Sequence, residues 1–201
     1  MKRIFPILLM SVIIFNAGIL SAIKSRSVVS VNIPLTSLKN GDLILRNGKG
    51  MVSHWFRRMS LHDQQFSHAG LIDIVNNTVF VLHAYQESNP SGLIKETLDQ
   101  FINPDLCDKY AIYRYELNNH QRETVHENML KDLKNEIPFD DAFELNNGKA
   151  VYCTEWIHDC LNKSMNDSNY IPKSVVKDFS FISPDNLYLN SHAYKLLQKQ
   201  Y

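Results

Sequence analysis

The sequence predicts a single α+β domain in which short strands come first and helices follow. Up to residue 115, β-branched or alternating stretches stand between turn residues, whereas amphipathic spacing dominates from residue 120 onward. Segregated strands and helices are typical of an antiparallel sheet with helices packed on it. At 201 residues, the chain is long enough for one domain with its own core, which we place at residues 38–201.

Turn residues and periodicity predict the elements of this domain in order. Strands are expected at 43–45, 66–75, 78–84 and 110–115. Helices are expected at 51–59, 95–102, 120–135, 152–161 and 172–178. Asn76-Asn77, between two strands, indicates a two-residue hairpin turn. Ser183-Pro184-Asp185 is typical of a helix start, and 194–198 fits either a strand or a helix.

Residues 1–22 differ from the rest of the chain and predict a signal peptide or an N-terminal anchor. Residues 1–3 are basic at positions 2 and 3, residues 4–20 form an apolar run, and small residues follow. A buried N-terminal helix is the alternative, but the run lacks a polar face. We expect an exported protein, periplasmic or held at the membrane through residues 4–20. Residues 23–37 have no clear period and read as a linker.

The charge balance and the cysteines limit the classes of function. Lys+Arg and Asp+Glu both number 21, so no nucleic-acid partner is expected. Of the three cysteines, Cys153 and Cys160 lie two helical turns apart, a Cα separation of roughly 10 Å that exceeds the reach of a disulfide. A Cys107–Cys160 disulfide stays open. An unpaired thiol in an exported protein calls for a function.

Cys153 is the candidate nucleophile, and His68 is its candidate base. Cys153 opens a predicted helix, where free N–H groups and the helix dipole favour the reactive thiolate, as would a neighbouring imidazolium. His68 lies on a predicted strand and precedes Ala69-Gly70, small residues that allow another element to approach closely. The alternative for either residue is a structural role in the core.

His83 is the candidate third member of the site. The strand that carries it pairs with the strand of His68, so the two histidines are expected almost opposite each other, within about one residue. His83 would then accept the Nδ1 proton of His68 and fix its tautomer. An ordinary hydrogen-bonded histidine is the alternative.

Other readings of the polar residues are weaker. A zinc site made of His68, His83 and Cys153 has sensible ligand types, but its spacing matches no metal motif, so neither a metal nor another cofactor is expected. His54 and His62 flank an aromatic cluster and are expected on a solvated face. Asp140-Asp141 reads better as turn and capping residues than as an acid–base pair.

Five segments in this order resemble one family. They are Asn40-Gly41-Asp42-Leu43-Ile44, Phe66-Ser67-His68-Ala69-Gly70, Val81-Leu82-His83-Ala84, Pro138-Phe139-Asp140 and Tyr152-Cys153-Thr154-Glu155. The series is similar to the circularly permuted NlpC-type papain-like cysteine hydrolases of the YiiX/YebB-like group, over residues 38 to 190. The resemblance implies a small, barrel-like antiparallel sheet with the cysteine helix packed on it.

The resemblance also implies a Cys–His–polar triad, here Cys153, His68 and His83. Many relatives place Glu where this chain has His83. Such an enzyme cleaves an amide through a thioester, and the Cys153 N–H is the expected oxyanion donor. The Tyr152 hydroxyl is a candidate second donor, and Trp55 is a candidate site-lining residue, with core packing as the alternative for both.

Two classes of substrate and one other function stay open. Peptidoglycan peptides fit an exported NlpC-type enzyme. Acyl lipids or amides would fit because the permuted branch also resembles lecithin retinol acyltransferase-like proteins, which use two histidines and a later cysteine. A binding module on the same scaffold without turnover is the third reading.

Overall fold

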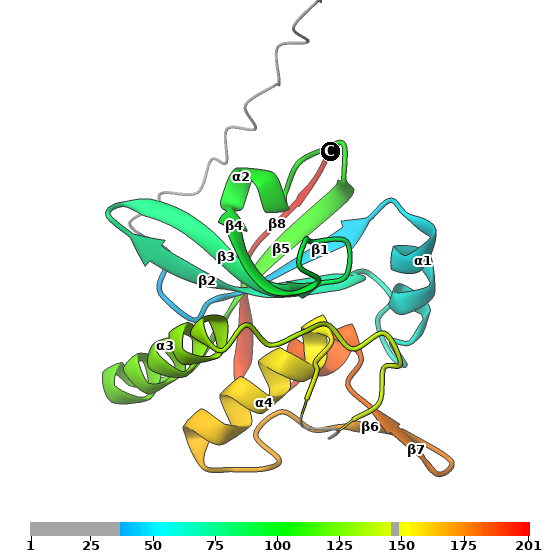
Figure 1. Cartoon of the computed structure of the whole chain (residues 1–201). Coiled ribbons are helices and arrows are strands. Elements are labelled where there is room, and N and C mark those ends of the chain that lie inside the picture. The colour runs from blue at the N-terminus through cyan, green and yellow to red at the C-terminus, as the bar shows by residue number, and fades with distance from the viewer. Residues whose placement is uncertain (1–36, 146–148) are drawn as a thin grey trace, which may run out of the picture.

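The computed structural model describes residues 37–145 and 149–201, which form one layered α+β domain (Figure 1). Its main sheet has six strands, all antiparallel to their neighbours, in the order β4-β3-β2-β1-β5-β8. The strands are β1 (Leu43–Gly48), β2 (His68–Val75), β3 (Thr78–Tyr85), β4 (Gly92–Thr97), β5 (Cys107–Tyr115) and β8 (Ala193–Gln200). The antiparallel sheet with packed helices that the sequence predicted is confirmed, although the sheet stays open between its edges β4 and β8 and forms no closed barrel within the described residues. The segments 1–22 and 23–37, apart from residue 37, lie outside the described residues.

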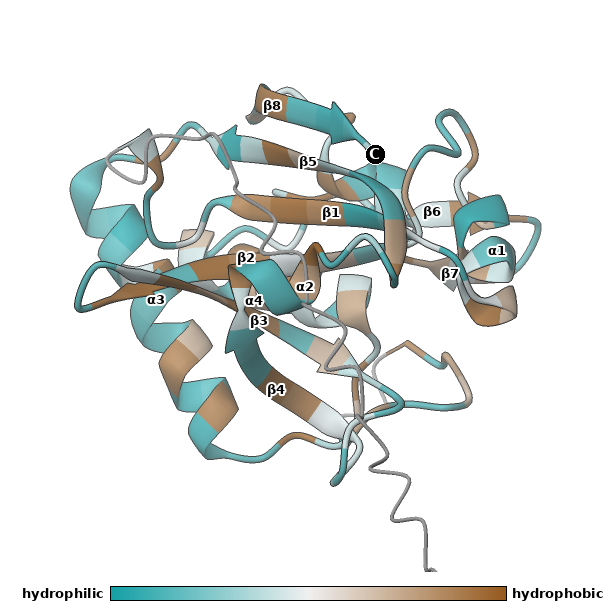
Figure 2. Ribbon diagram, turned by 90° about the horizontal axis from the view of Figure 1, so that it is seen from above, coloured by the Kyte–Doolittle hydropathy of each residue, from teal (hydrophilic) through white to brown (hydrophobic). Residues whose placement is uncertain are grey.

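Helices cover both faces of the sheet. They are α1 (Met51–Arg58), α2 (Leu98–Phe101), α3 (Asn119–Lys134), α4 (Cys153–Met165) and the 3-10 helix η2 (Pro184–Leu187). Helices α3 and α4 lie under one face, and α2 lies on the other (Figures 1 and 2). None of the helices between residues 37 and 201, with 146–148 set aside, has the length and apolar character needed to cross a membrane.

The central strands bury side chains on both faces, because successive residues of a strand point to opposite sides. Leu43 and Leu45 of β1 join the core between the sheet and helices α3 and α4. Ile44, between them, joins a second core together with Phe101 of α2. The first half of strand β1, Leu43 to Leu45, is correspondingly apolar (Figure 2). The doubly covered sheet is the rigid support on which the site residues stand.

The predicted hairpin is confirmed. Asn76 and Asn77 have φ values of 49° and 64°, the left-handed conformation that a type I′ turn requires and that asparagine tolerates. This turn joins β2 to β3, with Leu71 paired to Leu82 and Val75 to Thr78.

Strand pairing decides the outcome of three other expectations, which concern residues 95–102, 172–178 and 194–198. The helix expected at 95–102 is wrong for its first part, because β4 continues to Thr97, whose side chain then caps α2. The short helix expected at 172–178 is also wrong. Pro172 suggested a helix start, but the chain forms the hairpin of β6 (Ser174–Val176) and β7 (Phe179–Phe181). Residues 194–198 belong to strand β8, and the helix start at Ser183 is confirmed as η2.

Candidate active site

Cys153 occupies the first position of helix α4. The preceding Tyr152 has an extended backbone and makes no side-chain cap, so the first-turn N–H groups are left for other acceptors. Backbone N–H groups of Ala69 and Thr154 donate to the Cys153 sulfur. Cys153 is therefore held against Ala69, the residue that follows His68 on strand β2.

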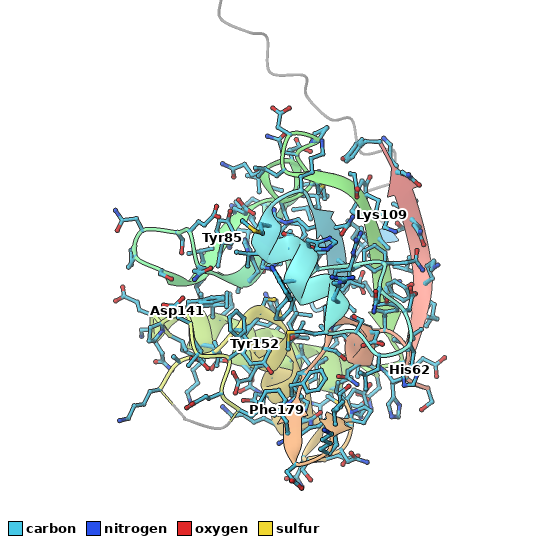
Figure 3. All side chains as sticks on the ribbon, turned by 90° about the vertical axis from the view of Figure 1, so that its right-hand side faces the viewer. His62, Tyr85, Lys109, Asp141, Tyr152 and Phe179 are labelled. Atoms are coloured by element: carbon cyan, nitrogen blue, oxygen red, sulfur yellow. The ribbon has the colours of Figure 1, made fainter. Side chains whose placement is uncertain are left out.

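A pocket of about 300 Å³ opens over this thiol. Cys153, His68 and Arg46 lie in its wall, and helix α1 forms one side of it. In Figure 3, Tyr85, which lines the pocket, and Tyr152 both lie beside α1. Most of the remaining wall is apolar, from Met51, Val52, Phe56, Leu106, Phe139 and Phe143. This size is at the lower end for sites that bind small molecules.

His68 and His83 make a direct hydrogen bond. His68 Nε2 lies 2.7 Å from His83 Nδ1, and the two rings meet at 82°. Phe101 stacks on the His68 ring, with centroids 5.6 Å apart. Because Nε2 of His68 is engaged by His83, Nδ1 is the ring nitrogen left to act on a neighbouring thiol.

The register of the hairpin corrects the expected position of His83. Continuing the β2–β3 pairing from Leu71 and Leu82 places His83 opposite Gly70 and leaves His68 two positions further along the strand. The histidines are thus diagonal neighbours on one face, within reach of imidazole rings. His83 also meets Nε2 of His68, in place of the expected Nδ1.

Gly70 makes the close approach of the two strands feasible. A Cβ atom there would lie 2.4 Å from a methyl group of Val81, 2.9 Å from the Leu82 carbonyl oxygen and 3.3 Å from the His83 Cβ. The small residues noted in the sequence therefore do leave space for another element, which is the strand of His83.

Two functional neighbours were missed in the sequence. Glu96 Oε1 lies 3.0 Å from Nε2 of the fully buried His83, and the Arg46 guanidinium lies 3.9 Å from the same oxygen. Arg46 also donates to the Phe101 carbonyl oxygen at 2.7 Å. Glu96 pairs with Val81, two residues before His83 on β3, and so shares the face of His83, but reading 95–102 as a helix concealed this.

Burial keeps the thiol and both imidazoles neutral. It raises the pKa of the Cys153 thiol to about 12, although the N–H groups of Ala69 and Thr154 and the charge of Arg46 act in the opposite direction. Burial, aided by the Arg46 charge, holds the pKa of His68 well below 6.5. Burial also lowers the pKa of His83, against the raising effect of Glu96. The N–H groups at the helix start thus favour the thiolate, as expected, but desolvation opposes them and is the largest effect.

Tyr152 and Trp55 do not serve the pocket as expected. The Tyr152 hydroxyl is buried and accepts the Ile182 N–H at 3.0 Å, so it packs α4 against the core instead of facing a substrate. Trp55 points away on the outer side of α1, 65% exposed, and its neighbour Phe56 lines the pocket in its place. The amphipathic turn of α1 places adjacent residues on different sides.

The remaining candidates have structural roles. Asp140 accepts the N–H groups of Ala142 and Glu144, as expected of a turn residue. All three cysteines are free and buried, so the open possibility of a Cys107–Cys160 disulfide is excluded. Cys160 lies in the core beside the Val125 carbonyl group.

Comparisons with known proteins agree with this fold. The model of the permuted papain-like amidase family YaeF/YiiX, C92, matches residues 37–192. Among solved structures, the chain is similar to metalloprotein YiiX from Escherichia coli O157:H7, with a TM-score of 0.66 and 16% identity over 81% of this chain and 98% of that one. No curated protein matches.

The description of YiiX as a metalloprotein raises the question of a metal site in this chain. Within residues 37–145 and 149–201, no group of three or more His, Cys, Asp or Glu side chains could hold a metal ion. His68 and His83 instead use ring nitrogens to bind each other at 2.7 Å, which leaves no space for an ion between them. The described donors do not fit a metal.

Proposed function

The chain belongs to the permuted papain-like amidase family, and on that premise we propose that it is a thiol amidase with Cys153 as nucleophile, His68 as base and His83 as orienting residue. The observation that carries this proposal is the hydrogen bond of 2.7 Å between His68 Nε2 and His83 Nδ1 in the wall of the pocket that contains Cys153. With Nε2 engaged by His83, Nδ1 is the nitrogen of His68 that is left for Cys153, which lines the same pocket.

The neutral resting pair sets the order of the proton transfers. His68 Nδ1 takes the Sγ proton as sulfur attacks the substrate carbonyl carbon, which gives a tetrahedral oxyanion. The Cys153 N–H, at the first position of α4, donates to that oxyanion. The amine then leaves with the proton from His68, and a thioester remains. Water, deprotonated by His68, attacks the thioester and releases the acid and the thiol.

Two substrate classes follow from the pocket and the sequence. We propose cell-wall peptides as the first, with residues 1–22 directing export to the periplasm or holding the protein at its membrane. Acyl lipids or acyl amides are the second, favoured by the apolar wall of Phe56, Phe139 and Phe143 beside the thiol. Incubation with muropeptides and with acyl-lipid amides and esters, read by mass spectrometry, separates the two.

Replacement of the nucleophile tests the reaction itself. We expect Cys153→Ala to lower turnover by roughly 10⁴-fold or more and to remove the single iodoacetamide adduct of the native protein. Cys160→Ala is the matched control, because the Cys160 thiol lies in the core, outside the pocket. This variant should keep both the native turnover and the iodoacetamide adduct. Equal labelling of the two variants would overturn the assignment of Cys153. Binding of one substrate class without turnover would indicate a binding module.

A further inference from the structure

Resting on the proposed function, we propose that Glu96, on the strand next to His83, is a positioning residue that fixes the tautomers of both histidines. Glu96 lies on β4, and His83 on β3 bridges it to His68. The expected order of groups is Cys153, His68, His83 and Glu96.

The buried His83 ring carries the argument. It is fully buried between β2, β4 and Phe101, so its polar atoms need partners within the protein. Nδ1 meets His68, and Glu96 Oε1 is 3.0 Å from Nε2, although it approaches away from the ideal N–H direction. A carboxylate can only accept a hydrogen bond, so the proton of a neutral His83 lies on Nε2.

The tautomer of His83 then determines that of His68. With its proton on Nε2, His83 presents an unprotonated Nδ1, which can only accept. His68 must therefore donate from Nε2, and its Nδ1 is left unprotonated. Nδ1 is the nitrogen that the proposed mechanism needs as a base toward Cys153. In the opposite arrangement, His83 would donate from Nδ1, and a neutral His68 would carry its proton on Nδ1 and could not act as the base.

Arg46 lies beside the Glu96 end of this series. Its guanidinium lies 3.9 Å from Glu96 Oε1 and is fixed by a hydrogen bond of 2.7 Å to the Phe101 carbonyl oxygen. It also packs over the Phe101 ring at 4.5 Å from the centroid. The charge of this buried cation disfavours protonation of His68 and of His83. Arg46 therefore acts on both ends of the histidine pair.

Glu96→Gln tests the assignment because glutamine can donate as well as accept, so it no longer enforces the tautomer. We expect kcat to fall about 10- to 100-fold, the effect of losing one hydrogen bond to a charged group. Asp73→Asn is the matched control, because Asp73 is also a buried carboxylate with a histidine partner, but it lies on the opposite face of the sheet. This substitution should leave kcat unchanged.

A second variant separates positioning from simple destabilisation. His83→Glu combined with Glu96→Gln places a carboxylate directly beside His68 Nε2 and removes the need for the relay. We expect this double variant to recover activity to within about tenfold of the native protein, because the direct carboxylate replaces the lost hydrogen bond. A double variant no more active than Glu96→Gln, with melting temperatures of the two alike, would overturn the relay.

Nitrogen NMR of the imidazoles gives a reading that does not require turnover. In the Cys153→Ala protein, we expect His83 and His68 both to be protonated on Nε2 and unprotonated on Nδ1. A proton on His83 Nδ1 would overturn the inference even if the enzyme is active. The expected tautomers without turnover of any amide by the native protein would instead count against the proposed function and leave the role of Glu96 intact.

Discussion

Two histidine–carboxylate pairs lie on opposite faces of the sheet formed by β2, β3 and β4. On the pocket side of the sheet, His83 Nε2 is 3.0 Å from Glu96 Oε1. On the side of helix α3, His126 Nε2 is 2.7 Å from Asp73 Oδ1. The pairs have the same chemistry and comparable distances, but they differ in what the second ring nitrogen meets. His83 turns it to another imidazole, whereas His126 turns it to the side chain of Asn40.

One strand supplies opposite charges to the two pairs. Lys95 points to the α3 side and binds Asp73 at 2.6 Å, and Glu96, the next residue, points to the other side. The α3-side pair is closed by partners that fix its position and is remote from the pocket. The pocket-side pair continues into His68, which lines the pocket. Connection to an accessible reactive group distinguishes a candidate catalytic pair from a structural pair.

Removal of each histidine should give the largest contrast. We expect His83→Ala to lower kcat by about 10²- to 10⁴-fold, because His68 loses the group that orients it. His126→Ala should change kcat less than about twofold when assayed below its melting temperature, since His126 touches no pocket residue that we assign a role. Steady-state kinetics on the two proteins decide this. Similar losses in both would remove the functional distinction between the pairs.

Removal of the α3-side carboxylate charge should affect stability instead of activity. Asp73 is fully buried and accepts from both Lys95 and His126. We expect Asp73→Asn to lower the free energy of unfolding by about 1–3 kcal/mol, because Lys95 and His126 lose the charge of their buried partner. Urea denaturation measures this change. A stability equal to that of the native protein would show that the pair contributes nothing net.

The two pairs should also respond to acid in different pH ranges. The pKa values of His68 and His83 are lowered from 6.5, so the unfolded chain binds more protons below pH 6.5 and stability falls as the pH drops from there. The pKa of Asp73 is lowered from 3.8, so its contribution persists above that pH and is lost below it.

Urea midpoints measured from pH 8 to pH 5 test the first of these ranges. The slope should be at most about 1.4 kcal/mol per pH unit for each proton. The slope should shrink in His83→Gln, which removes one of the two buried imidazoles, and persist in Asp73→Asn. A flat profile between pH 6.5 and pH 5 in the native protein would contradict the neutral, buried histidines.

Local sequence patterns predicted much of the fold. The hairpin at Asn76-Asn77 follows from the ability of asparagine to adopt positive φ, and α3 follows from its apolar spacing at Val125 and Met129. The errors occurred where local preference and tertiary pairing disagree. Strand β4 carries helix-compatible residues, but β3 provides its hydrogen-bond partners, and no local pattern reveals that edge.

The same division holds for the candidate site. Cys153, His68 and His83 could be selected because residue type and element position suggest chemistry. The structure brings all three to one region. Arg46 and Glu96 could not be selected from the sequence, because their importance depends on strands that meet only in the folded sheet. The charge state of Cys153 was also beyond the sequence, since burial outweighs the helix start.

The turn at Asn76-Asn77 has a consequence for how the protein can be altered. It lies at the far end of the β2–β3 hairpin from His68, yet its length sets which residues of the two strands share a face. A shift of pairing by one residue moves every side chain of a strand to the other side. A loop lengthened by a single residue would therefore separate His83 from His68 while leaving the content of secondary structure almost the same. Enzymatic turnover would thus detect a change in strand alignment that circular dichroism does not detect.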